Sequence, residues 1–165
     1  TYYWTKDREF MKVIDLPSCC QTPLELALGV EEEVSSMLTK HGWLLVNSVD
    51  ISRDFDSYRK YIQQSRGEFT VARDQYVRPN TGWFSDRSAC YLAAGRPVIT
   101  QETGFSKYLP TGNGLFGFTT VDDILTAIEA IEKDHRAHCH AAKEIAAEYF
   151  AAEKVIGSLM KRAGL

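Results

Sequence analysis

The chain has 165 residues, with 19 lysines and arginines against 22 aspartates and glutamates, which gives a formal charge of −3. This balance offers no electrostatic basis for binding nucleic acid or an anionic membrane. A chain of this length buries roughly 70% of its unfolded surface without disulfides, which favours a single domain over residues 1–165. No apolar run approaches the roughly 20 residues of a membrane helix, and residues 1–10 lack a signal-peptide pattern, so we expect a cytoplasmic protein without a membrane span.

Short apolar runs predict strands along the whole chain. In chain order these strands cover residues 1–4, 24–29, 43–46, 69–72, 98–100 and 114–118. Helical spacing of apolar residues predicts the segments between them as helices: residues 6–13 (ended by Pro17), 30–41, a helix after Asp54, 85–94, a helix after Thr120, and two further helical stretches up to Gly164. Strand and helix therefore alternate almost throughout. The pattern predicts an α/β fold with a Rossmann-like, doubly wound parallel sheet in three layers (α/β/α), followed by C-terminal helices.

Several helix ends carry recognisable signals. Asp54 is a suitable N-cap, and Thr120 with Asp123 forms the pattern of a capping box. Gly42 and Gly95 can adopt the left-handed conformation that closes a helix.

The segment 82–118 is the most informative part of the chain. A loop, a helix, a Gly-Arg-Pro turn, an apolar strand and a second glycine-rich loop follow one another there. The helix starts with Ser85, Asp86, Arg87 and Ser88, and unpaired amides at a helix start bind anions. The alternative is an ordinary cap made by Ser85 or Asp86, with Arg87 solvated.

A second candidate position follows the predicted strand 98–100. Thr103 and Gly104 lie in the loop at its carboxyl end, where open α/β sheets bind ligands. Gly104 allows backbone to approach a ligand closely, and Thr103 offers a hydroxyl. The alternative is a plain turn. The polar stretch 73–82 is predicted as a long loop, a feature that is often functional.

The segment Ala-Ala-Gly-Arg-Pro-Val-Ile (93–99), the Thr-Gly-Phe of residues 103–105, the Leu-Pro of 109–110 and the Gly-Asn-Gly-Leu-Phe of 112–116 together resemble a known family. They are similar to the C-terminal, nucleotide-sugar-binding domain of GT-B-fold glycosyltransferases, and the resemblance covers most of the chain. Residues 65–72 and 82–87 resemble a bacterial group of uncharacterised members.

The resemblance implies a nucleotide diphosphate sugar as the donor substrate, with Ser85, Asp86, Arg87 and Ser88 beneath its diphosphate and no metal or other cofactor. It also implies that an N-terminal acceptor domain is missing, because a complete GT-B enzyme has two such domains and the chain starts without methionine. We therefore expect the full-length protein to transfer a hexose-like sugar and the fragment alone to be inactive. No catalytic residue is assigned.

The family also places basic residues near the diphosphate. Lys6 and Arg73 are the candidates here, with Arg8 and Arg78 as weaker ones, although their spacing does not match the family closely. Cys90 stands where many retaining members carry a ribose-binding glutamate, and a thiol is a poor substitute. A non-catalytic nucleotide-binding or scaffolding module of the same fold is therefore the alternative function.

Other interpretations are weaker. His135, His138 and Cys139 share a helical face, but structural zinc usually needs four ligands, so we expect no metal site. The four cysteines lack metal or redox spacing and are expected to be reduced. A receiver-like signalling domain of flavodoxin type would need clustered aspartates at the first strand ends, and Gly29 and Ala72 stand there instead.

Overall fold

A computed structural model of the chain describes residues 3–29 and 31–164. Its strands are β1 (Glu25–Leu28), β2 (Leu44–Asn47), β3 (Glu68–Thr70), β4 (Val98–Gln101) and β5 (Leu115–Phe118). Its helices are α1 (Asp7–Met11), α2 (Leu16–Cys19), α3 (Glu32–Lys40), α4 (Ser48–Ile51), α5 (Phe55–Gln64), α6 (Asp74–Val77), α7 (Asp86–Ala93), the 3₁₀ helix η1 (Phe105–Lys107), α8 (Val121–Lys133), α9 (His135–Tyr149) and α10 (Ala152–Arg162).

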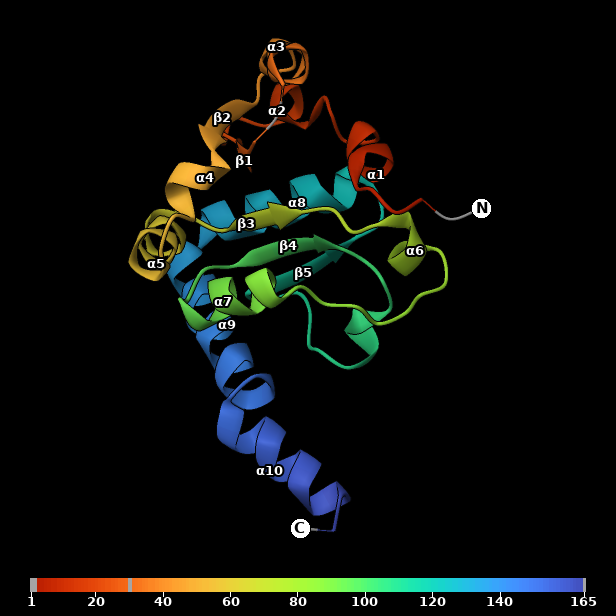
Figure 1. The fold of residues 1–165 in the computed structure, drawn as a ribbon, viewed down its shortest axis with the longest axis vertical. Coiled ribbons are helices and arrows are strands. Elements are labelled where there is room, and N and C mark those ends of the chain that lie inside the picture. Colours follow the sequence, from red (N-terminus) through yellow and green to blue (C-terminus); the bar gives the residue numbers. More distant parts are fainter. Residues whose placement is uncertain (1–2, 30, 165) are drawn as a thin grey trace.

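The strands form two small parallel sheets. One sheet pairs β1 with β2, and the other has the order β3-β4-β5 (Figure 1). Leu26 lies opposite Leu45 in the first sheet, and Ile99 lies between Phe69 and Phe116 in the second. The prediction of an α/β fold with parallel strands is therefore confirmed, but the five described strands do not join into one hydrogen-bonded sheet.

The hydrophobic core consists of two clusters of buried side chains. Two neighbouring residues of β4, Val98 and Ile99, belong to different clusters. Ile99 packs with Ile124, Ala127 and Ile131 of α8, in a cluster that also holds Trp43. Val98 instead packs with residues of α7 and α9, Leu92 and Ala142 among them. Because neighbouring residues of a strand point to opposite faces, these contacts place α8 against one face of β4 and α7 with α9 against the other.

The predicted caps are confirmed. The Asp54 side chain accepts from the Ser57 amide at 2.8 Å, and Thr120 with Asp123 forms a complete capping box at the start of α8. Gly95, just after α7, has φ of +69°. Two polar caps and one glycine in the left-handed conformation therefore set these helix ends.

Some predictions at the N-terminal end were wrong. Tyr3 and Trp4 lie in no strand, while Thr1, Tyr2 and Val30 fall outside the described residues. Pro17 does not stop a helix but occupies the first turn of α2, where a missing N–H costs nothing.

Three single-turn helices, α2, α4 and α6, were not predicted. Helix α4 begins where Asn47 accepts a hydrogen bond from the Val49 amide at 2.9 Å. Helix α6 occupies part of the stretch 73–82 that was predicted as loop. Single-turn helices of this kind depend on tertiary contacts more than on propensity.

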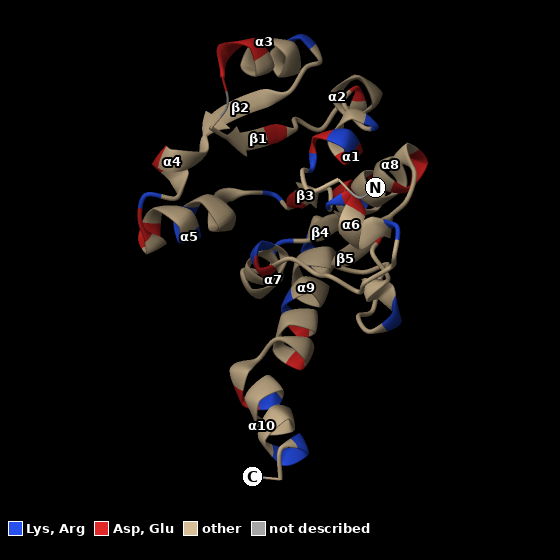
Figure 2. Cartoon of the chain, turned by 45° about the vertical axis from the view of Figure 1, so that its right-hand side comes forward, with Lys and Arg blue, Asp and Glu red and all other residues tan. Residues whose placement is uncertain are grey.

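The C-terminal helix α10 extends away from the rest of the molecule, while β1, β2 and α3 lie together at the opposite end (Figure 1). Lysines and arginines are scattered among acidic residues over most helices rather than gathered on one element (Figure 2). Within the described ranges, no helix combines the length and the apolar character needed to cross a bilayer.

Candidate functional site

Two cationic side chains converge on the hydroxyl of Thr70, the last residue of β3. Lys6 Nζ donates to Thr70 Oγ1 at 3.2 Å, and Arg87 Nη2 donates to the same oxygen at 2.8 Å. Lys6 comes from the segment before α1 and Arg87 from the first turn of α7. The fold thus brings together two predicted site residues that are 81 positions apart in the chain.

Glu68 supplies the negative charge in this group. Its Oε1 accepts from Arg87 Nε at 2.5 Å, and its carboxylate is almost fully buried. Its other oxygen, Oε2, is buried without a hydrogen-bond partner among the described residues. Arg87 is therefore not simply solvated, as one interpretation of the sequence held, but is held between a carboxylate and a hydroxyl.

Lys6 lies in an environment that opposes its own charge. Burial is the largest cause that lowers its pKa, from 10.5 to about 8, and the positive charge of Arg87 lowers it further. Arg73 acts in the same direction, and only Glu68 opposes them. The Lys6 ammonium also lies 5.8 Å from the centre of the Trp83 ring.

The group of Lys6, Arg73, Arg87 and Glu68, here called the cationic cluster, carries three positive charges and one negative charge. Within residues 3–29 and 31–164, neither Lys6 nor Arg73 forms an ion pair. The cluster therefore has an excess of two positive charges beside a partly buried strand end. An anion that enters this position gains electrostatic energy that a fully solvated site does not provide.

The start of α7 lies next to this cluster. Ser85 is the N-cap residue, but its side chain makes no capping hydrogen bond. The first helical bond runs from the Ala89 amide to the Ser85 carbonyl at 3.1 Å, so the amides of Asp86, Arg87 and Ser88 precede the helical ladder. The ordinary side-chain cap that the sequence offered as an alternative is not formed by Ser85.

Ser88 lies in the same turn and is fully buried. Its Oγ has no hydrogen-bond partner among the described residues. Buried hydroxyls are normally satisfied, so this unpaired one is suited to a buried water molecule. Asp86, by contrast, is exposed and lies at the first helical position.

Thr103 and Gly104 have structural partners. Thr103 Oγ1 donates to the Trp83 carbonyl at 2.6 Å, and the Gly82 amide donates to the Thr103 carbonyl at 2.7 Å. Gly104 has φ of +92°, and a Cβ atom there would meet the Asn80 carbonyl oxygen at 3.0 Å. These two residues hold the 80–83 segment, which carries Trp83 over Lys6.

A buried polar network fixes α1 against the sheet. Gln101 of β4 donates to Glu9 at 2.5 Å and accepts from the Ala72 amide at 3.0 Å, while Lys12 pairs with Glu9 at 2.7 Å. The network holds the segment that presents Lys6. Sequence reasoning did not single out Glu9, Gln101 or the Thr70 hydroxyl, and no local pattern in the sequence indicates them.

The weaker candidates lie elsewhere. The Arg8 guanidinium carbon lies 4.1 Å from the centre of the Tyr3 ring, and Arg78 Nε lies 2.7 Å from Oδ1 of the buried Asp74. The hydrogen bond from Arg78 is the main cause that holds the pKa of Asp74 below its usual value. Burial acts in the opposite direction and has a smaller effect.

The histidines of α9 make structural contacts. His138 Nδ1 accepts from the Gly114 amide at 3.2 Å, and His135 Nε2 lies 2.8 Å from the Arg66 carbonyl oxygen. No group of three or more histidine, cysteine, aspartate or glutamate side chains in the described part of the chain is arranged to hold a metal ion.

A cavity of about 820 Å³ opens beside the cationic cluster and continues between the two sheets. Lys6, Glu68, Thr70 and Arg87 border it together with apolar residues of β1, α5 and α8. Its volume is within the range of small-molecule sites.

Comparison of the chain with protein-family models, with curated protein sequences and with solved structures finds no significant match.

Proposed function

We propose that the cationic cluster and the start of α7 bind the diphosphate of a nucleotide sugar, and that the chain is the donor-binding domain of a glycosyltransferase. The observation that carries the proposal is the convergence of Lys6 and Arg87 on Thr70, at 3.2 and 2.8 Å, with Glu68 as the single carboxylate of the cluster. A doubly charged anion matches the excess of two positive charges.

The leaving group of such a reaction is a nucleoside diphosphate, whose negative charge grows as the glycosidic bond lengthens. Lys6, Arg73 and Arg87 would stabilise that charge together with the open amides of α7, without a metal ion. The acceptor and the base that activates it would come from an N-terminal domain, so the chain alone would bind the donor and transfer nothing.

We further propose that the two sheets belong to one Rossmann-like, doubly wound sheet with helices on both sides. The alternate packing of Val98 and Ile99 supports this arrangement, as does the position of the cluster at the carboxyl end of β3, where such folds bind their ligands. A cytoplasmic location fits the four free cysteines.

The test is a calorimetric titration of the chain with UDP, GDP, ADP, dTDP and inorganic pyrophosphate. We expect one nucleotide to bind more tightly than pyrophosphate, and Arg87→Ala to weaken that binding by about tenfold, as expected for the loss of a charged hydrogen bond. Lys60→Met is a matched control for Lys6→Met, because Lys60 is exposed on α5 and does not border the cavity. Absence of saturable binding by all five ligands, or an equal effect of both lysine variants, would contradict the proposal.

One observation favours the alternative of a non-catalytic module of the same fold. Glu68 already occupies one side of the Arg87 guanidinium, which lowers its capacity to bind phosphate. Under this alternative, a scaffolding module binds no nucleotide and Arg87→Ala only destabilises it, whereas a non-catalytic nucleotide-binding module binds nucleotide but transfers no sugar when the N-terminal domain is present. The same titrations and a sugar-transfer assay on the full-length protein therefore separate the functions.

A further inference from the structure

The cavity of about 820 Å³ is bordered by the edges of two strands rather than by their faces. Its lining includes every residue from Thr22 to Leu28 around β1 and every residue from Ser65 to Val71 around β3. A cavity against the face of a sheet would touch alternate residues, because neighbouring side chains point in opposite directions. Contact with consecutive residues on both sides indicates that two backbone edges face each other across the space.

The hydrogen-bond pattern identifies the free backbone groups. Leu44 donates its amide to the Leu24 carbonyl at 2.9 Å, so residues 24, 26 and 28 face β2, and Glu25 and Ala27 face the cavity. Glu68 donates its amide to the Pro97 carbonyl at 2.9 Å, so Glu68 and Thr70 face β4, and Gly67 and Phe69 face the cavity. Within the described residues, no hydrogen bond joins β1 to β3. Both edges thus present unpaired amides and carbonyls.

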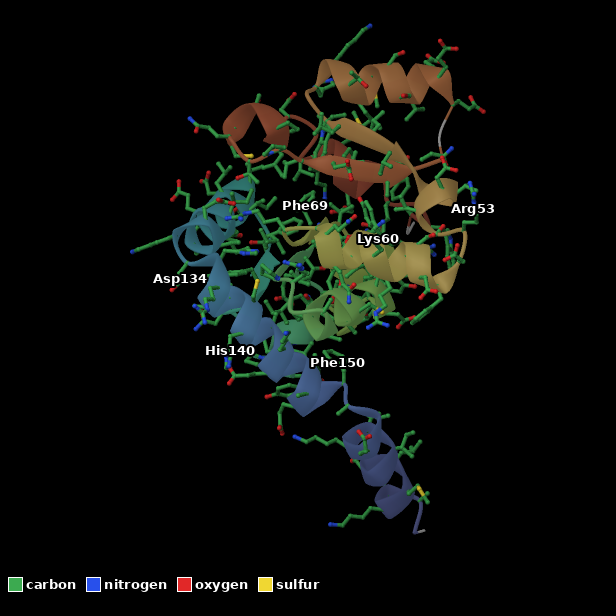
Figure 3. All side chains as sticks on the ribbon, turned by 90° about the vertical axis from the view of Figure 1, so that its left-hand side faces the viewer. Arg53, Lys60, Phe69, Asp134, His140 and Phe150 are labelled. Atoms are coloured by element: carbon green, nitrogen blue, oxygen red, sulfur yellow. The ribbon has the colours of Figure 1, made fainter. Side chains whose placement is uncertain are left out.

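The side walls of the cavity are apolar and aromatic. Ile128 and Ile131 of α8 lie on one side, and Tyr58 and Tyr61 of α5 on the other. Figure 3 shows the β1–β2 sheet set apart from Phe69 and the helices below it, with side chains extending into the space between. An occupant must therefore offer backbone groups to two edges and apolar side chains to two walls.

We infer that this cavity is a slot for one additional β-strand, supplied by an apolar polypeptide segment that pairs with β1 and β3 at the same time. A residue in a packed strand occupies roughly 160 Å³, from a rise of about 3.3 Å, a strand spacing of about 4.8 Å and a layer spacing of about 10 Å. The cavity therefore holds about five residues, a length that matches its neighbours. A strand buried on both faces has a nearly continuous apolar sequence, rich in valine and isoleucine.

The added strand gives a six-stranded sheet of order β2-β1-added strand-β3-β4-β5. If it runs parallel to β3, its carboxyl end lies beside the cationic cluster, because Thr70 ends β3 there. The residues after the strand would then complete the wall of the proposed anion site. The inference itself does not depend on nucleotide binding, because it rests on the strand edges and the cavity.

The test uses a fluorescent peptide with five alternating valines and isoleucines between lysine ends, added to the 165-residue chain. Binding is followed by fluorescence polarisation, and amide hydrogen exchange is read residue by residue by NMR. We expect bound peptide to slow exchange about tenfold or more at Ala27 and Phe69, and to change it little at Leu26 and Thr70, whose amides are already paired within the sheets.

Two control peptides carry N-methyl groups on either the odd or the even residues, which blocks one hydrogen-bonding edge at a time. Both are expected to lose binding, because the slot uses both edges of the strand. The inference would be overturned if only one of the two N-methylated peptides lost binding, or if the bound valine–isoleucine peptide slowed exchange at only one of Ala27 and Phe69. It would also be overturned if that peptide did not bind at millimolar concentration.

Discussion

Arg87 on α7 donates its Nε–H to Glu68 on β3 over 2.5 Å and ties the first turn of the helix to the strand end beneath it. Glu68 has a side chain only 4% exposed, whereas the Arg87 side chain is 43% exposed. The carboxylate is therefore buried, while the guanidinium, which also donates to the Thr70 hydroxyl, stays partly open to solvent. Glu68 orients Arg87 and at the same time limits the charge that Arg87 can offer to a ligand.

Replacing Glu68 with glutamine should separate these two effects. We expect Glu68→Gln to lower the free energy of unfolding by about 1–2 kcal/mol, less than for a fully buried pair because Arg87 is partly solvated. Affinity for the nucleoside diphosphate should rise, since the guanidinium loses a competing anion. Urea unfolding and calorimetry measure the two quantities. The control is Glu132→Gln, which breaks the exposed pair with Arg66 at 2.7 Å and should cost under about 1 kcal/mol.

Lys6 should make stability depend on pH. Its pKa is about 8 in the folded chain against 10.5 for an ordinary lysine, so the unfolded chain holds more of this proton between those values. The free energy of unfolding should therefore rise with pH from about 8 to 10.5. Lys6→Met should lack this rise. The difference in free energy of unfolding, variant minus unsubstituted chain, should therefore be most favourable to the variant at neutral pH. Urea unfolding at pH 7, 9 and 10.5 tests this, and a parallel pH dependence of both proteins would contradict it.

The same titration predicts how binding changes with pH. An anion favours protonated Lys6, so affinity for a nucleoside diphosphate should be full near pH 7 and weaken as pH rises through about 8. In Lys6→Met the affinity should be lower and flat over this window. Calorimetry at constant ionic strength follows both. A decline of equal size in the variant would assign the effect to another group.

Some helix ends could be predicted because their signals are local. Gly95 and Thr120 act through their own backbone or through residues three positions away, and both behave as the sequence predicts. The Arg87–Glu68 contact spans 19 positions and the Gln101–Glu9 contact spans 92, and no local preference encodes either distance. The sequence therefore indicated the cations of the candidate site but not the carboxylate and hydroxyl that organise them.

The sequence did not indicate the division into two sheets, for a related reason. Apolar runs predict that a segment is a strand, but hydrogen bonds between strands depend on tertiary arrangement. The run at residues 24–29 does form β1 and that at 69–72 overlaps β3, yet their facing edges stay unpaired. The sequence pattern that predicts a strand does not indicate whether another strand pairs with its edge.

Gly114 should tolerate no side chain. Its φ is +71°, and a Cβ atom there would overlap the backbone of Ala142 in α9. We expect Gly114→Ala to destabilise the chain by about 3 kcal/mol or more, because neither backbone can move without disturbing the core. Gly112→Ala is the matched control, with φ of +98° and nothing within 4 Å of the new atom, and should cost only about 1 kcal/mol of backbone strain. Equal melting temperatures for the two variants would disprove the close approach of α9.

The hydroxyl of Thr103 provides a last test, of whether this residue binds ligand or supports the loop. It donates to the Trp83 carbonyl at 2.6 Å and is 1% exposed, so its hydrogen is already used. Thr103→Val should lower the free energy of unfolding by about 1–2 kcal/mol, since the Trp83 carbonyl loses its donor. Nucleotide affinity should change less than about threefold, because Lys6 and Arg87 keep their positions. The exposed Thr111→Val serves as control for both measurements. A loss of affinity much larger than the loss of stability would instead show that Thr103 contacts the ligand directly.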